Sequence, residues 1–317
     1  MAHRLGTVKA PDGRALGVAQ WGDPDGSAVF GLHGTPGSRF GRPSDEAGLE
    51  RAGLRMVTYD RPGYGVSDRQ PGRRVVECAE DVAAIADALD IGRFAVTGGS
   101  GGGPHALAVA ARLGRRVTAA ECRVGAAPFD AEGLDWWAGM DPQNVREFRW
   151  AIEGEQVLRE RLAPLAAQDL ARIAKDPSKI LSDDWQLADA DRERLARPDV
   201  QRMLVEGMRG AYAAGVWGWV DDDLRSSPDG ASAWMRSRCR SPSATARRMS
   251  SFPPVTAPGW PRTSPERRLW SPPKTATFPI PTPGSRSCAR WSRPAEPPEL
   301  FAAPPGVYLS GRRRPPR

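Results

Sequence analysis

A single serine flanked on both sides by paired glycines, in the segment 98–102 (Gly-Gly-Ser-Gly-Gly), is the residue best placed to do chemistry. An apolar run at 94–97 precedes it and an alanine-rich stretch that begins at Pro104 follows it, so the chain passes from a strand through a tight corner into a helix. A glycine-walled corner holds a serine hydroxyl clear of the backbone, above the N-terminus of the helix. We therefore predict a nucleophile whose corner consists of Gly98, Ser100, Gly101 and Gly102, with the Gly101 N–H aimed at a developing oxyanion.

Two further glycine-rich loops precede the serine, and each also follows an apolar run. The first is His-Gly-Thr-Pro-Gly at 33–37, after residues 28–32, and the second is Asp-Arg-Pro-Gly-Tyr-Gly-Val-Ser at 60–67, after residues 54–58. In order and separation, these loops and the serine corner resemble the HGxPG loop, the D-x-x-G-x-G-x-S loop and the nucleophile corner of the α/β-hydrolase superfamily. The pattern also looks like the proline iminopeptidase branch, and many esterases are similar.

The resemblance implies roles that the pattern alone does not assign. It makes the backbone N–H of Thr35 the second oxyanion donor, beside Gly34, and it makes His33 a structural residue of the loop. Serine at the corner separates the chain from the dehalogenases of the superfamily, whose nucleophile there is aspartate. The implied activity is cleavage of an ester or amide bond in a small molecule through an acyl-enzyme on Ser100, with no cofactor.

Short apolar runs alternate with segments of helical spacing over the first part of the chain. This alternation predicts an α/β fold with a mostly parallel sheet and helices on both faces. The resemblance implies that this fold is the α/β-hydrolase fold. We expect a core at 1–133, a helical cap at 134–224 and an aberrant tail at 225–317. The predicted strands are 15–21, 28–32, 54–58, 94–97 and 116–126, and the predicted core helices are 75–89 and 104–113.

The expected cap carries apolar and aromatic side chains at helical intervals over residues 134–220, with charged residues between them. We predict further helices at 170–173 and 200–208. Two interpretations of the aromatic residues are open. They line a substrate pocket, or they pack the cap onto the core, which we favour because large aromatic side chains usually serve packing.

The tail beyond about Leu224 is rich in proline, serine and arginine, and its apolar residues follow neither the 3.6-residue period of a helix nor the two-residue period of a strand. Residues 226–317 hold fifteen arginines and one lysine against four acidic residues, a net charge of +12, whereas the whole chain carries +7. The first 225 residues therefore carry −5, the balance of an ordinary enzyme. We expect the tail to stay largely unfolded, the last strands to be missing or disordered and no nucleic acid to bind. The alternative is that the tail is a true, divergent part of the protein and that its arginine-rich segment binds an anionic partner.

Metal, membrane and disulfide roles find no support in the sequence. No window approaches the roughly 20 apolar residues of a membrane span, and no apolar leader follows the first charges. We expect a cytoplasmic protein without metal, cofactor or membrane partner, and the oligomeric state stays open. The cysteines show no paired or metal-ligand spacing: Cys78, Cys122, Cys239 and Cys288.

The general base is where the sequence departs from the superfamily. A nucleophilic serine of this kind needs an acid and then a histidine later in the chain, because a neutral hydroxyl is a weak nucleophile. The three histidines are His3, His33 and His105, and none follows the last of these. Some members place the acid after the sixth strand, which makes Asp130 a candidate. The favoured alternative for Asp130 is a turn or helix-cap residue.

A change of reading frame between about Leu224 and Arg238 would account for the missing base. The codons can be regrouped so that each new codon begins with the third base of the old one. In that frame, the codons for 248–261 permit Asp-Glu-Phe-Val-Pro-Pro-Gly-His-Gly-Ala-Trp-Leu-Ala. Those for 273–283 permit Glu-Asp-Gly-His-Leu-Ser-Asp-Pro-Asp-Thr. These strings resemble, in the right order, the superfamily's acid loop and its late Gly-His loop.

Three hypotheses for the chain follow: an impaired hydrolase, an inactive pseudoenzyme that binds a ligand at most, or a chain that does not fold stably.

Sequencing the gene across codons 220–290 tests the frame hypothesis. We expect Asp and His codons in the shifted frame over the segments 248–261 and 273–283, downstream of an insertion or deletion. A single intact frame without those shifted codons rules the hypothesis out.

Overall fold

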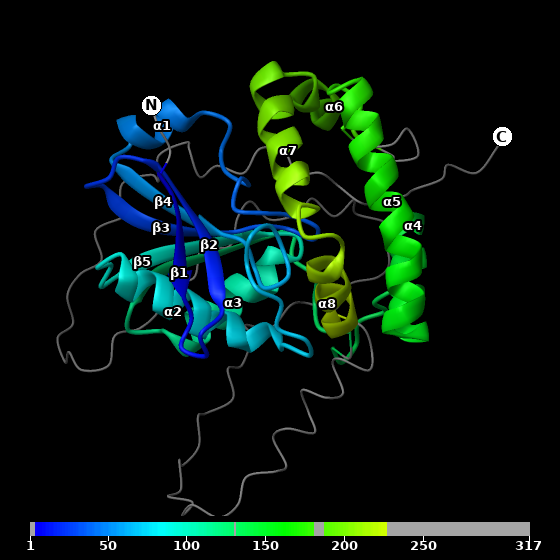
Figure 1. The fold of residues 1–317 in the computed structure, drawn as a ribbon, viewed down its shortest axis with the longest axis horizontal. Helices are drawn as coiled ribbons and strands as arrows, with labels where there is room; N and C mark the ends of the chain where they lie inside the picture. Colours follow the sequence, from blue (N-terminus) through cyan, green and yellow to red (C-terminus); the bar gives the residue numbers. More distant parts are fainter. Residues whose placement is uncertain (1–3, 130, 181–186, 227–317) are drawn as a thin grey trace, which may run out of the picture.

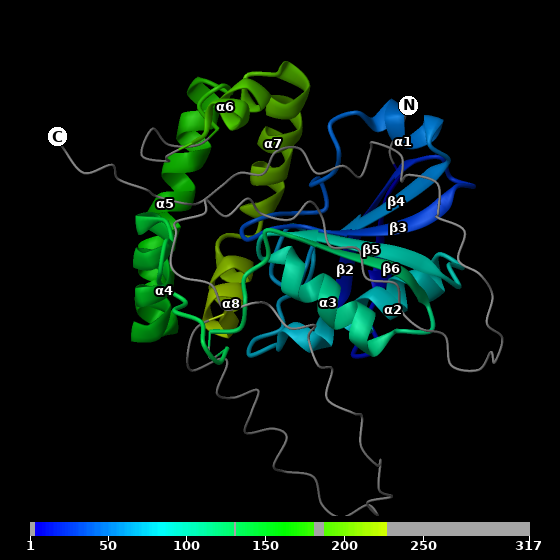
Figure 2. The ribbon, with the colours of Figure 1, turned by 180° about the vertical axis from the view of Figure 1, so that it is seen from behind.

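The computed structural model describes residues 4–129, 131–180 and 187–226. A twisted sheet packs against three helices, and a second group of helices, α4 to α8, lies beside it (Figure 1). We call this second group the cap. Seen from behind, α3 covers the β5 and β6 side of the sheet (Figure 2).

The sheet of the described residues has six strands in the order β1-β2-β4-β3-β5-β6. β1 and β2 run antiparallel to their neighbours, whereas β4, β3, β5 and β6 are parallel to one another. The mostly parallel sheet predicted from the sequence is confirmed. The strands are β1 (Arg4–Lys9), β2 (Ala15–Gly22), β3 (Ser27–Leu32), β4 (Leu54–Tyr59), β5 (Phe94–Gly99) and β6 (Val117–Arg123).

Helices cover both faces of the sheet, as predicted. The 3-10 turn Val75–Glu77 leads into α2 (Cys78–Ala88), and α2 and α3 (Gly102–Arg112) pack on one face, while α1 (Glu46–Arg51) packs on the other. The alternation within β2 shows why. Its even-numbered residues Leu16 and Val18 join the core with α2 and α3, and its odd-numbered residue Trp21 packs with Leu49 of α1 and with Met56.

The register of β3 and β5 fixes the position of the serine corner. Leu32, the last residue of β3, pairs with Gly98 near the end of β5. The loop after β3 and the corner after β5 therefore leave the sheet side by side. They do so at the carboxyl ends of the strands, where open α/β sheets bind ligands.

The cap begins with a capped helix and builds a core of its own. The Asp141 side chain accepts a hydrogen bond from the Gln143 N–H, and Gly154, at φ 117°, separates the first two helices. Leu158 and Leu162 are fully buried in the cap. The helices are α4 (Pro142–Glu153), α5 (Glu155–Lys175), α6 (Asp189–Leu195), α7 (Pro198–Ala211) and α8 (Trp217–Ser226).

The predicted separate helix at 170–173 is wrong. These residues belong to the last turns of α5, which continues through Pro164. Leu158, Leu162 and Ala166 form one apolar stripe at helical spacing, and Leu170 and Ile173 extend it, so burial holds the helix together across the proline. The helix predicted at 200–208 lies within α7.

Most aromatic residues of the region before and within the cap pack on other side chains. Trp136, Trp137, Phe129 and Phe148 form a cluster with ring centroids 4.7 to 5.8 Å apart in the contacting pairs. Trp219 stacks on Tyr212, with ring centroids 5.9 Å apart. These residues therefore pack mainly on one another, and the contacts do not test whether aromatic residues pack the cap onto the core.

Other sequence expectations fall partly or wholly beyond the described residues. α8 continues to Ser226, two residues past the predicted cap boundary, and residues 227–317, which hold most of the expected tail, lie outside the described residues.

Two elements of the structure, β1 and α1, were not predicted from the sequence, and the strand predicted at 116–126 ends at Arg123. None of the described helices combines the length and the hydropathy needed to cross a membrane.

A pair of carboxyl groups lies between α4 and α8, with Asp223 buried and Glu147 half-buried. Asp223 is 2% exposed and hydrogen bonds to Glu147, whose Oε1 also accepts from Trp219 Nε1 at 2.7 Å. Burial, and then the neighbouring Glu147 carboxyl, raise the pKa of Asp223 well above its usual value. Because the folded-state pKa exceeds that of the unfolded chain, the bound proton favours folding at low pH. This contribution is lost as the pH rises through the folded-state value.

The substitution Asp223→Asn should raise the melting temperature at neutral and alkaline pH and flatten its pH dependence, since an amide keeps the hydrogen bond to Glu147 without titrating. We expect a rise of about 2–4 °C, the shift that ~1 kcal/mol produces in a domain of this size. Thermal unfolding at pH 5 to 9 measures it. The exposed Asp189→Asn variant is the control and should leave the curve unchanged. An unaltered pH dependence in Asp223→Asn would contradict the assignment.

Candidate active site

The serine corner joins β5 to α3 in a conformation that only a tight turn produces. Ser100 is exposed and lies at φ 51°, in the left-handed region. A Cβ at Gly98 would lie 2.1 Å from the Gly102 carbonyl oxygen, and a Cβ at Gly102 would lie 2.2 Å from the Leu32 carbonyl oxygen. The chain can therefore make this corner only with glycine at both positions.

The loop after β3 lies directly on the corner. A Cβ built on Gly101 would be 3.2 Å from the Thr35 backbone nitrogen and 2.3 Å from Thr35 Oγ1, and one built on Gly34 would be 3.6 Å from the Ser100 Cβ. Among the hydrogen bonds of the described residues, neither the Thr35 N–H nor the Gly101 N–H has an acceptor within the chain. The structure thus brings together the four residues that the sequence predicted for nucleophile and oxyanion donors.

His33 joins the loop after β3 to the loop after β4. The Arg61 backbone N–H donates to its Nε2 at 3.1 Å, so its Nδ1 carries the proton and donates to the Gly34 carbonyl at 2.7 Å. Burial, and then the Arg61 charge, hold the pKa of His33 well below its usual value. With both ring nitrogens engaged, His33 has the contacts of a structural residue.

His105 is buried in α3 below the corner. Its Nδ1 donates to the Gly101 carbonyl at 2.8 Å, and burial, followed by the Arg61 charge, lowers its pKa to about 3. His105 is therefore neutral at physiological pH and directed along its own helix. The two remaining candidates, His3 and Asp130, lie outside the described residues.

A buried carboxylate from the cap, Asp222 of α8, contacts the loop after β3. Its Oδ2 accepts from Thr35 Oγ1 at 2.7 Å, from Arg61 Nη2 at 2.6 Å and from Tyr64 Oη at 2.8 Å. Its Oδ1 accepts from Arg73 Nη2. Burial alone would raise the pKa of Asp222, but Arg61 and Arg73 outweigh it and hold that pKa well below its usual value. Asp222 is thus an ionised acid inside the protein.

Sequence reasoning missed Asp222, although a signal was available. Residues 221–223 are three consecutive aspartates in α8, after the buried Trp219 and Val220. Successive helical residues are turned by about 100°, so three carboxylates in a row cannot all face solvent on a helix that buries its preceding residues. The run therefore required inward-facing acids, and the arginines at 61, 69 and 73 were their available partners.

Residues 28–187 match the family described as alpha/beta hydrolase fold. The chain belongs to the α/β-hydrolase family. It is 33% identical over 150 residues to a non-heme chloroperoxidase of Streptomyces lividans, covering 47% of this chain and 54% of that one. It is 30% identical over 155 residues to a proline iminopeptidase of Arabidopsis thaliana, covering 46% and 40%. The chain spans about half the length of the curated relatives it matches.

Solved structures agree with this α/β-hydrolase fold. A variant of the Vigna radiata epoxide hydrolase superposes with a TM-score of 0.52 at 17% sequence identity, over 74% of this chain and 76% of the other. At this level of identity the likeness concerns the fold.

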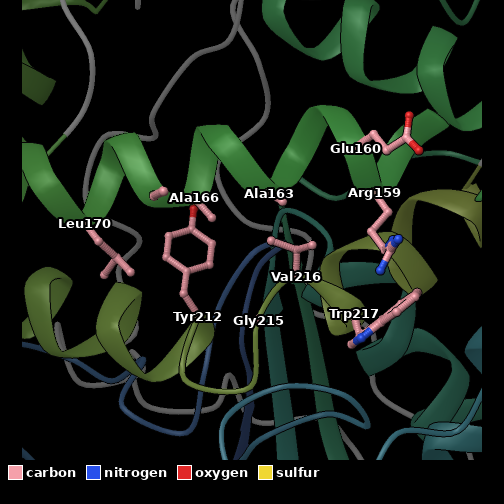
Figure 3. A pocket seen from close by; sticks show the side chains of 10 residues that line it. Arg159, Glu160, Ala163, Ala166, Leu170, Tyr212, Gly215, Val216 and Trp217 are labelled. Atoms are coloured by element: carbon pink, nitrogen blue, oxygen red, sulfur yellow. The ribbon is translucent and has the colours of Figure 1, made fainter. Parts of the chain in front are cut away.

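A cavity of about 550 Å³ opens in the cap of this α/β-hydrolase, between α5 and the turn from α7 to α8 (Figure 3). Tyr212 and Trp217 are its aromatic walls. Neither Ser100 nor Thr35 borders the cavity. It is lined by Arg159, Glu160, Ala163, Ala166, Ala167, Leu170, Tyr212, Gly215, Val216 and Trp217.

The substitution Gly98→Ala should destabilise the protein, because the new methyl group would meet the Gly102 backbone. Overpacking of this kind costs ~1–3 kcal/mol, so the melting temperature should fall by about 2–12 °C. Gly92→Ala is the matched control, since nothing lies within 4 Å of its Cβ position. Thermal unfolding compares the two, and equal melting temperatures would contradict the corner geometry.

Proposed function

We propose that this member of the α/β-hydrolase family is a serine hydrolase. Ser100 attacks the carbonyl carbon of a small ester or amide, and the N–H groups of Gly101 and Thr35 bind the oxyanion. The observation that carries the proposal is the exposed serine at positive φ, next to two backbone amides without an acceptor in the described part of the chain. The bond from the carbonyl carbon to the alcohol or amine then breaks, and this leaving group takes up the proton of the Ser100 hydroxyl. Water hydrolyses the acyl-enzyme to the carboxylic acid and restores the Ser100 hydroxyl.

The proposal includes slow turnover, because the described histidines are poor bases. His33 uses both ring nitrogens in hydrogen bonds, and His105 is buried with a pKa lowered to about 3. Without a base the Ser100 hydroxyl keeps its proton, and loss of the triad histidine costs on the order of 10⁴ to 10⁶ in rate. We keep Asp130 as a proposed acid, and the frame change, the domain bounds and the cytoplasmic location also stay predictions.

Two names among the relatives support a small acyl substrate. The relative from Arabidopsis thaliana is a proline iminopeptidase, and a relative from Acinetobacter calcoaceticus, 32% identical over 108 residues, is a bifunctional esterase/perhydrolase. Ester and amide bonds share the tetrahedral oxyanion that the Thr35 and Gly101 amides would bind. The proposal therefore covers both bond types.

An inactive pseudoenzyme is the second candidate, favoured by the same two buried histidines. It keeps the corner and the loop after β3 but binds a ligand without forming an acyl-enzyme. The two candidates differ in whether Ser100 reacts at all.

A fluorophosphonate probe with mass-spectrometric mapping separates these candidates. We expect labelling at Ser100 that is about 10⁴-fold slower than in a chain whose codons after 224 are read in the shifted frame, because that chain would regain a histidine base. Imidazole in the buffer should speed the slow reaction, since it supplies the missing base. Ser100→Ala is the control and should show no labelling at this position under either condition.

Fast labelling without imidazole would contradict the missing base. Absence of labelling at Ser100, even with imidazole, would contradict the serine hydrolase and leave the pseudoenzyme. Equal rates in the original and the shifted-frame chain would contradict the frame hypothesis alone.

A further inference from the structure

The peptide plane between Gly34 and Thr35 is held from one side. The Gly34 carbonyl oxygen accepts from His33 Nδ1 at 2.7 Å and from Arg61 Nη2 at 3.1 Å. In a planar trans peptide the N–H points opposite to the carbonyl. Because Arg61 and His33 fix the carbonyl, the Thr35 N–H is directed away from Arg61, and the adjacent backbone is that of Gly101.

The Thr35 side chain is held at the same point by the cap. Its Oγ1 donates to Asp222 Oδ2 at 2.7 Å, and Arg61 Nη2 donates to Thr35 Oγ1 at 3.2 Å and to Asp222 Oδ2 at 2.6 Å. The three groups form a closed triangle in which Arg61 and Asp222 are almost completely buried. Movement of Asp222 would therefore release both the Thr35 hydroxyl and the guanidinium that fixes the Gly34 carbonyl.

We propose that Asp222 is a positioning residue for the oxyanion hole, which holds Thr35 against Gly101 from the last described helix of the cap. The inference rests on the proposed function, because it assigns the Thr35 N–H to the oxyanion. It makes docking of α8 a condition for transition-state stabilisation and not only for the shape of the cap.

The neighbouring Asp221 separates this role from simple attachment of the cap. Asp221 is also buried in α8 and binds Arg69 through both carboxylate oxygens, each at 2.9 Å. None of its hydrogen bonds reaches the loop after β3 within the described residues. An aspartate that only anchors the cap should behave like Asp221.

Three variants of the full chain test the proposal: Asp222→Asn, Thr35→Val and, as matched control, Asp221→Asn. The rate of Ser100 labelling by the fluorophosphonate, with imidazole present, should fall about 10- to 100-fold in the first two and stay within twofold in the control. Removal of an oxyanion donor costs about 10²–10³, and these two variants displace the Thr35 N–H without removing it. With an activated ester as substrate, kcat should fall while KM stays unchanged. The double variant Asp222→Asn/Thr35→Val should lose no more of the labelling rate than Asp222→Asn alone, because both substitutions act on the same contact.

A readout that needs no activity is the hydrogen exchange of the Thr35 amide, which should accelerate in Asp222→Asn and in Thr35→Val but not in Asp221→Asn. Thr35→Val keeps the proposal testable where Asp222→Asn, which leaves Arg61 and Arg73 without their carboxylate, fails to fold. Equal effects of Asp221→Asn and Asp222→Asn on labelling, or unchanged Thr35 exchange, would overturn the positioning role. Failure of the parent chain to label at Ser100 would instead overturn the proposed function.

Discussion

The close approach of three backbone segments at the carboxyl ends of β3 and β5 is the constraint on which the candidate site depends. The end of β3, the end of β5 and the first turn of α3 meet so closely that a Cβ at Gly98 or Gly102 would lie 2.1 or 2.2 Å from a carbonyl oxygen. Since no side chain fits there, the loop after β3 can lie on the corner, and α3 begins at Gly102, two residues after Ser100. The proposed chemistry of the serine follows from this contact.

The cap is attached to the core beside that corner, through ion pairs and through a backbone hydrogen bond. The Gly218 N–H of α8 donates to the Gly63 carbonyl at 3.1 Å, and a side chain at Gly218 would collide with the Tyr64 ring. Around this contact, Asp221 and Asp222 bind arginines of the core. α8 thus packs directly against the loops after β3 and β4, whereas the cavity beside α5 lies within the cap.

The sequence predicted the parts of the molecule whose signals are local. Residues 94–97 and Ser100 sit in a strand–corner–helix pattern, and the alternation of apolar runs with helical spacing was enough for the fold class. β1 gave no such signal, because its residues are mostly exposed and lack a two-residue apolar period. The run of aspartates at 221–223 could indicate that an acid of α8 faces inward, but not what it binds. The partners of Asp222, which are Thr35, Arg61 and Tyr64, lie 187, 161 and 158 positions away, and only folding joins them.

The cluster around Asp222 also acts on the two buried histidines through its charge. Two buried guanidiniums, from Arg61 and Arg73, bind the Asp222 carboxylate, and Arg73 also interacts with the charge of Asp221. Burial lowers the pKa of His33 and of His105, and the Arg61 charge lowers both further, because a cation nearby disfavours a second one. The guanidinium that joins the cap to the loop after β3 therefore also keeps the neighbouring imidazoles from accepting protons.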